Sequence, residues 1–145
     1  MFAFSGFNDR KLSKCEVFDV QRGIWKEITP ICAARTKFSA LAISKSRILI
    51  FGGKQADGCR TGDIEEYNLK HNSFKKLPFK MPKARSGFAA CFVREESCIF
   101  FCGGNSGSGQ GSGSSGNVLK KFDCLDLKQG KWSRLPDMIQ RRDEL

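Results

Sequence analysis

The side chains of this 145-residue chain that could do chemistry are seven cysteines, a single histidine and many arginines. The cysteines form no C-x-x-C pair, and Cys98 and Cys102, four positions apart, lack the nearby histidines or further thiols of a zinc site. His71 alone cannot supply the ligands that copper or zinc requires. We therefore expect reduced thiols, no metal and no cofactor.

Three arginines recur in one context and are the strongest candidates for binding chemistry. Arg35, Arg85 and Arg142 each follow a segment in which an apolar residue precedes a proline. A guanidinium can hold a carboxylate through two parallel hydrogen bonds, so these side chains fit an acidic ligand. The alternative is that they bond to backbone carbonyls of the neighbouring unit of the fold, and both interpretations stay open.

The charge of the chain defines the partners it could attract. Lys and Arg number 25 against 15 Asp and Glu, which gives a formal net charge of +10. Acidic proteins, nucleic acid and anionic lipid are all attracted by such a charge. Nucleic acid is the alternative function, because basic residues recur in pairs. These pairs are Lys75-Lys76, Lys120-Lys121 and Arg141-Arg142.

The apolar segments indicate where the protein resides. All of them are too short to span a bilayer as a helix, so no membrane partner is expected. The first residues lack the basic and apolar regions of a signal peptide, and the C-terminal Arg-Asp-Glu-Leu could not serve as a retrieval signal without one. We expect a cytoplasmic protein.

The elements that would position these side chains form an internal repeat. Gly52-Gly53 follows a short apolar run and Gly103-Gly104 follows another, 51 positions later. A degenerate copy, Ser5-Gly6, lies in the same phase. Glycine pairs at strand ends permit positive φ and close approach of neighbouring chains.

A second feature repeats in step with the glycines. An apolar–polar pair begins seven positions before a large aromatic residue in three places: Phe18 before Trp25, Tyr67 before Phe74, and Leu125 before Trp132. Each unit contains four short apolar runs separated by turn residues, which predicts a four-stranded antiparallel meander. In the middle unit the expected strands are 38–43, 47–51, 64–68 and 73–77. The aromatics are expected to form the core between neighbouring units.

These features together resemble the kelch repeat. The structural landmarks that carry the resemblance are Gly52, Gly53, Gly103, Gly104, Trp25, Phe74, Trp132, Phe18, Tyr67 and Leu125. Ser5, Phe74 and Leu125 depart from the usual glycine, tryptophan and aromatic residue. The resemblance implies an all-β fold, with about 2.75 four-stranded antiparallel blades of a partial or assembly-completed β-propeller.

The repeat also predicts how the chain is divided. We expect a partial repeat with strands two to four at 1–34, full repeats at 35–84 and 85–141, and the start of another at 142–145. The third repeat contains a Gly/Ser-rich loop at 105–117. So few blades leave apolar faces uncovered, so we expect either further blades from a longer chain or self-association.

The predicted function is protein–protein interaction, because propellers present variable loops from rigid blades. Kelch proteins often recruit substrates to ubiquitin ligases or bind the cytoskeleton, so the resemblance implies an adaptor rather than an enzyme. Connections after strands two and four emerge on one side of a blade, and we expect an acidic protein or peptide to bind there. The candidate binding residues are Arg35, Lys54, Arg60, Arg85, Asn105 and Arg142.

Overall fold

The computed structural model of the protein describes residues 1–107 and 117–145. Within these ranges it contains strands and turns and no α-helix, so the all-β prediction is confirmed. Most of the predicted Gly/Ser-rich loop, residues 108–116, lies outside the described residues. No helix in the described part of the chain has the length and apolar character needed to cross a membrane.

The strands form three larger antiparallel sheets and one small pair. The first sheet has three strands: β1 (Phe2–Asn8), β2 (Arg10–Asp19) and β3 (Ile24–Ile28). The second has the order β5 (Ser39–Ala42), β6 (Arg47–Phe51), β8 (Asp63–Asn68) and β9 (Ser73–Lys80). The third has the order β10 (Ala89–Val93), β11 (Cys98–Cys102), β12 (Phe122–Asp126) and β13 (Lys131–Leu135). The pair is β4 (Arg35–Thr36) with β7 (Lys54–Gln55).

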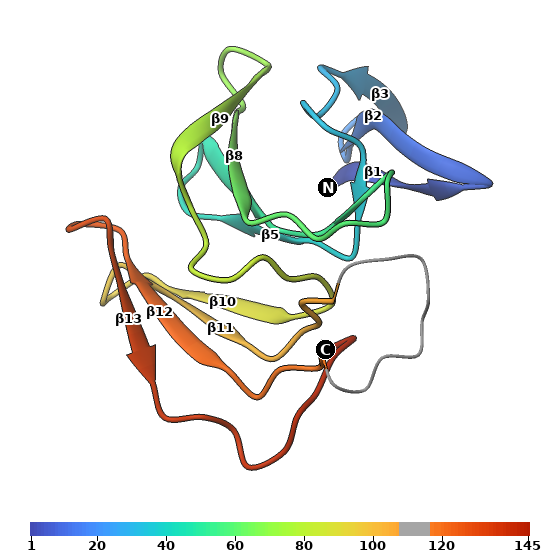
Figure 1. Ribbon diagram of the computed structural model, residues 1–145. Coiled ribbons are helices and arrows are strands. Elements are labelled where there is room, and N and C mark those ends of the chain that lie inside the picture. The colour runs from blue at the N-terminus through green and yellow to red at the C-terminus, as the bar shows by residue number, and fades with distance from the viewer. Residues whose placement is uncertain (108–116) are drawn as a thin grey trace.

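The three sheets follow one another around a common centre, near which both termini lie (Figure 1). This is the arrangement of successive propeller blades, so the partial-propeller prediction is confirmed. The four strands expected in the middle unit are present as β5, β6, β8 and β9. β9 extends to Lys80, beyond the expected end, because an irregularity in register between Asp63 and Glu65 lets Asp63 pair with Lys80.

The polar residue of each apolar–polar pair closes the turn that follows it. Asp19 accepts hydrogen bonds from the backbone N–H of Gln21 and Arg22, at 3.1 and 3.2 Å. Asn68 and Asp126 accept from the N–H groups two and three residues on in the same way. These Asx-type turns join the last two strands of each sheet, and they explain why the pair recurs at a fixed distance from the aromatic residue.

The core lies in two layers, one on each face of the second sheet. Ile48 and Ile50 of β6 face the first sheet, whereas Leu49 and Phe51 face the third. β6 is therefore a continuous apolar run, because both of its faces are buried. The layer against the third sheet is the larger and includes Phe88, Ile99, Phe101 and Leu125.

Two of the three landmark aromatics pack in these layers as expected. Phe74 packs against the layer between the first and second sheets, and Trp132 against the layer between the second and third. For Trp25 the expectation of a core position is wrong. Its side chain is 48% exposed, because no sheet in the described residues covers that face of β3.

Candidate functional site

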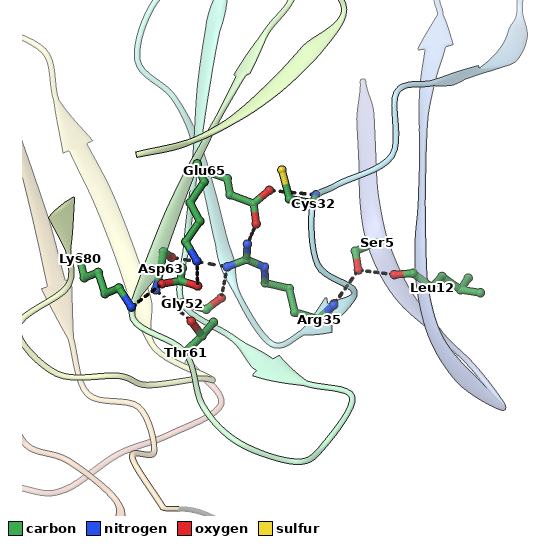
Figure 2. A network of polar contacts seen from close by, with 10 residues as sticks. Ser5, Leu12, Cys32, Arg35, Gly52, Thr61, Asp63, Glu65 and Lys80 are labelled. Carbon is green, nitrogen blue, oxygen red and sulfur yellow. Dashed lines mark hydrogen bonds and ion pairs between the residues drawn. The ribbon is translucent and has the colours of Figure 1, made fainter. Parts of the chain in front are cut away.

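The arginine that opens the second repeat is buried within it. Arg35 is 1% exposed, donates a hydrogen bond from Nη1 to the Gly52 carbonyl at 3.0 Å, and forms an ion pair with Glu65. Glu65 also accepts a hydrogen bond from the backbone N–H of Cys32 at 3.0 Å (Figure 2). Burial lowers the pKa of the Arg35 guanidinium, while the Asp63 carboxylate opposes that shift.

The arginine that opens the third repeat has the same environment. Arg85 is fully buried, with Nη1 3.4 Å from the Gly103 carbonyl and an ion pair to Asp123. We call this arrangement the arginine–carboxylate latch; its two copies are Arg35–Glu65 and Arg85–Asp123. Both guanidinium groups are buried. Their ion pairs and their contacts with glycine carbonyls lie within their own repeat, and not in the neighbouring blade as the alternative expected. Arg85 also donates from Nε to the Lys83 carbonyl of the preceding repeat, at 3.4 Å.

Three other predicted residues do meet at the surface. Lys54 lies on β7, directly after β6; Arg60 bridges back to Lys54; and Asn105 follows β11. They share a small polar pocket, which we call the loop-face pocket. It is lined by Lys37, Lys54, Arg60, Ser86, Gly87, Asn105, Asp143 and Glu144.

Equivalent backbone positions of successive repeats build this pocket. Lys37, Gly87 and Glu144 each lie two residues after a repeat-opening arginine, and each has positive φ, at 55°, 63° and 57°. The Gly87 N–H donates to the Lys37 carbonyl at 2.8 Å. Ser86 and Asn105 exchange two backbone hydrogen bonds, at 3.0 and 2.8 Å. Backbone hydrogen bonds between the repeats therefore hold several of the lining residues in place.

Two carboxylates of the chain itself lie in the loop-face pocket. Glu144 forms an ion pair with Lys37. The hydrogen bond from Lys37 lowers the pKa of the Glu144 carboxyl group. Asn105 donates from Nδ2 to a carboxylate oxygen of Asp143 at 3.3 Å. The pocket can therefore bind carboxylates through both a cation and an amide.

The site predicted from the sequence did not include Lys37 and Ser86, and it did include Arg142. Lys37 could have been found from its fixed spacing after Arg35, since Glu144 holds the same position after Arg142. The Arg142 side chain is exposed and is not among the lining residues. Its backbone is well fixed, because the Arg142 carbonyl accepts from the Gly104 N–H at 2.8 Å.

The side chains of residues 1–107 and 117–145 do not form a metal site. In those ranges no three His, Cys, Asp or Glu side chains are grouped so that they could hold a metal ion.

Two four-stranded antiparallel sheets, each opened by a buried arginine, follow a three-stranded sheet around a common centre, and this arrangement defines blades of the kelch type. The chain belongs to the family described as the KLHDC2/KLHL20/DRC7 Kelch-repeats domain, whose model matches residues 1–142. The prediction of kelch repeats is thus confirmed. Kelch repeats are generally protein-interaction domains, which agrees with the predicted class of function.

Two curated proteins are similar to this chain. Kelch-like protein 34 of Homo sapiens is 27% identical over 121 residues, which cover 83% of this chain and 18% of that protein. Alpha-scruin of Limulus polyphemus is 23% identical over 150 residues, covering 98% of this chain and 16% of that protein. The chain therefore spans less than a fifth of the length of either relative.

Proposed function

We propose that this kelch module binds an acidic segment of a partner protein in the loop-face pocket. The observation that carries the proposal is the position of the chain's own carboxylates, Asp143 and Glu144, on Asn105 and Lys37. A partner carboxylate would meet the same groups, with Lys54 beside them. The latch arginines would act by holding the pocket wall and not by touching the ligand.

The wider role in this proposal is that of a cytoplasmic adaptor without catalytic activity. Its support is the family, together with the net charge of +10, which favours acidic partners. Specificity would come from the fixed pocket, since charge alone attracts any polyanion. Because the described sheets form an open arc, we also propose that further blades or a second copy complete the ring.

A binding experiment with charge reversals tests the pocket. The probe is a fluorescent peptide of alternating aspartate and glutamate, titrated with the chain at physiological salt. Reversing Lys37→Glu and Lys54→Glu together places two carboxylates where the ligand carboxylates would bind. We expect the dissociation constant to rise by about tenfold or more.

The matched control reverses two charges on the opposite side of the blades, Lys45→Glu with Arg94→Glu. Lys45 lies in the turn between β5 and β6, and Arg94 follows β10. This variant has the same net charge as the pocket variant. Equal weakening by both variants, or equally tight binding of a single-stranded oligonucleotide, would show diffuse electrostatic attraction and would contradict the proposal.

A third variant uses the chain's own acidic residues. Asp143→Asn with Glu144→Gln removes the internal carboxylates, and with them the competition for Lys37 and Asn105. We expect this variant to bind the acidic peptide more tightly than the unmodified chain. Unchanged affinity would mean that the peptide binds elsewhere.

A further inference from the structure

The latch carboxylate occupies the same position in each repeat, and in the first sheet the residue at that position has no arginine partner among the described residues. Glu65 and Asp123 lie two positions before Tyr67 and Leu125, the first residues of the apolar–polar pairs. Glu16 holds the same position before Phe18 on β2. Its side chain is exposed and has no ion pair or hydrogen bond within the described residues. The first sheet therefore presents a free latch carboxylate.

The chain also holds a latch arginine that has no carboxylate. Arg142 follows the third sheet as Arg85 follows the second, and its backbone is fixed in the same way. The Arg85 carbonyl accepts from the Gly53 N–H at 2.9 Å, and the Arg142 carbonyl accepts from the Gly104 N–H at 2.8 Å. In the part of the chain that is described, the exposed Arg142 guanidinium forms no ion pair.

The apolar residues at the two ends of the arc match in the same register. On the first sheet, Phe18 and Trp25 lie 5.3 Å apart between ring centroids on an uncovered face. Their counterparts in the second sheet, Tyr67 and Phe74, are covered by the ring of Phe4, at 5.6 and 5.8 Å. Phe18 and Trp25 thus lack the aromatic cover that Phe4 gives to their counterparts in the second sheet.

The residues able to cover that pair lie on the third sheet. Relative to the second glycine of the pair, Phe100 and Cys102 occupy the positions of Phe2 and Phe4. They line an apolar groove together with Ala89, Cys91 and Phe122. The uncovered face of the third sheet therefore corresponds to the face of the first sheet that covers the aromatic pair of the second sheet.

We propose that two copies of this chain associate head to tail, with Arg142 of each copy pairing with Glu16 of the other. The groove at Phe100 and Cys102 of one copy covers Phe18 and Trp25 of its partner. A two-fold pair makes this contact twice and closes a ring of about six sheets. The ion pair fixes the register, and the apolar faces supply the burial. The inference does not depend on the acidic-peptide proposal, because it uses other residues.

Sedimentation of the 145-residue chain over a range of concentrations tests this assembly. We expect a species of twice the 16.2 kDa chain mass. Glu16→Arg brings two arginines together at both contacts, and Arg142→Glu brings two carboxylates together. Each variant alone is expected to raise the dissociation constant of the dimer by about tenfold or more.

Mixing the two variants is the decisive step. In the mixed pair, one contact joins the unmodified Arg142 to the unmodified Glu16. The other contact joins the two substituted side chains, so an arginine again faces a carboxylate with the charges exchanged. We expect dimers to return on mixing, a result that misfolded variants could not give. Lys45→Glu with Arg94→Glu is the control and should leave the dimer intact.

Three results would overturn the inference. The first is a chain that stays monomeric at all concentrations. The second is a dimer that neither single reversal weakens, because its contact would then lie elsewhere. The third is a mixture of the two variants that stays monomeric.

Discussion

The basic side chains divide into two roles that their residue type does not distinguish. Arg35 and Arg85 are buried in latches and hold the start of a repeat to its own third strand, β8 or β12. Lys37 and Lys54 lie only a few positions from the latch elements, yet they line a surface pocket. Charges buried in the fold and charges that line the pocket therefore alternate within a few residues of the repeat.

The first prediction concerns the Arg35–Glu65 latch. Arg35→Met leaves the buried Glu65 carboxylate with the Cys32 N–H as its remaining donor. Breaking a buried ion pair on one side costs about 3–5 kcal/mol of unfolding free energy. Urea denaturation measures the loss. Arg35→Met with Glu65→Leu removes both charges, and we expect it to recover part of that loss.

The control for this prediction is an exposed ion pair in the same sheet. Arg47 pairs with Glu66, with the two side chains 48% and 17% exposed. Arg47→Met is expected to cost about 0–1 kcal/mol, because exposed pairs contribute little. Equal losses from Arg35→Met and Arg47→Met would contradict the structural role of the latch.

The second prediction concerns Ser5, which replaces the first glycine of a pair. Its φ is 54°, close to the 60° of Gly52 and the 68° of Gly103. The serine hydroxyl lies 2.6 Å from the Leu12 carbonyl and 2.7 Å from the Arg35 carbonyl, so its proton has an acceptor in either direction. This bonding offsets the strain of a non-glycine residue with positive φ.

Two substitutions separate the hydroxyl from the strain. Ser5→Ala keeps the strained backbone and removes the hydrogen bonds, so we expect a loss of about 1–3 kcal/mol. Ser5→Gly removes both, and the relief of strain should keep its loss below about 1 kcal/mol. Thermal denaturation compares the two. Since neither variant has the hydroxyl, a larger loss for glycine than for alanine would mean that a side chain at position 5 does not strain the backbone.

At the scale of the elements, the strands follow from features that the sequence displays directly. The run Ile48 to Phe51 ends at a glycine pair, and Asn68 and Asp126 close turns at fixed spacings. Sequence periodicity captures such local rules. We propose that the repeat boundaries fall directly before the latch arginines, because there the chain passes from one sheet to the next.

Other features depend on contacts between distant segments, which the sequence does not display. Arg35 meets Glu65 and Arg85 meets Asp123, at unequal separations of 30 and 38 residues. The difference arises from the connection between β11 and β12. The residue type alone does not show whether an arginine pairs with a carboxylate inside the protein or binds a ligand at the surface. The charged lining of the pocket was therefore only partly predictable.

The third prediction compares two tryptophans that occupy the same position in different sheets. Trp132 packs against the core layer and lies 5.1 Å from the ring of Phe101, whereas Trp25 is 48% exposed. Trp132→Ala should cost about 3–5 kcal/mol, as for other buried aromatics. We expect Trp25→Ala to cost at least about 2 kcal/mol less, because it opens no internal cavity. Equal losses in urea denaturation of the monomer would contradict the packing of the first sheet.

At the scale of the whole molecule, the sheets form an open arc, and among the described residues only the middle sheet is covered on both faces. The second sheet packs against the first through Ile48 and Ile50, and against the third through Leu49 and Phe51. The first and third sheets each leave one face uncovered, which includes Trp25 at one end and the groove at Phe100 at the other. In a repeat protein each unit is stabilised by its neighbours, so stability should vary along the arc.

The last prediction is a gradient of hydrogen exchange along this arc. The amides of β6 and β8 should exchange most slowly, because both faces of their sheet are covered by core layers. The amides of β1 and β3 should exchange fastest, since they belong to a three-stranded sheet packed on the smaller layer. Local opening of an end unit exposes less apolar surface than global unfolding and so needs less free energy. Mass-spectrometric exchange at a concentration where the chain is monomeric measures the gradient. Raising the concentration should protect the first sheet selectively if a second copy covers Trp25, whereas uniform protection at every concentration would mean that the chain opens only as one cooperative unit.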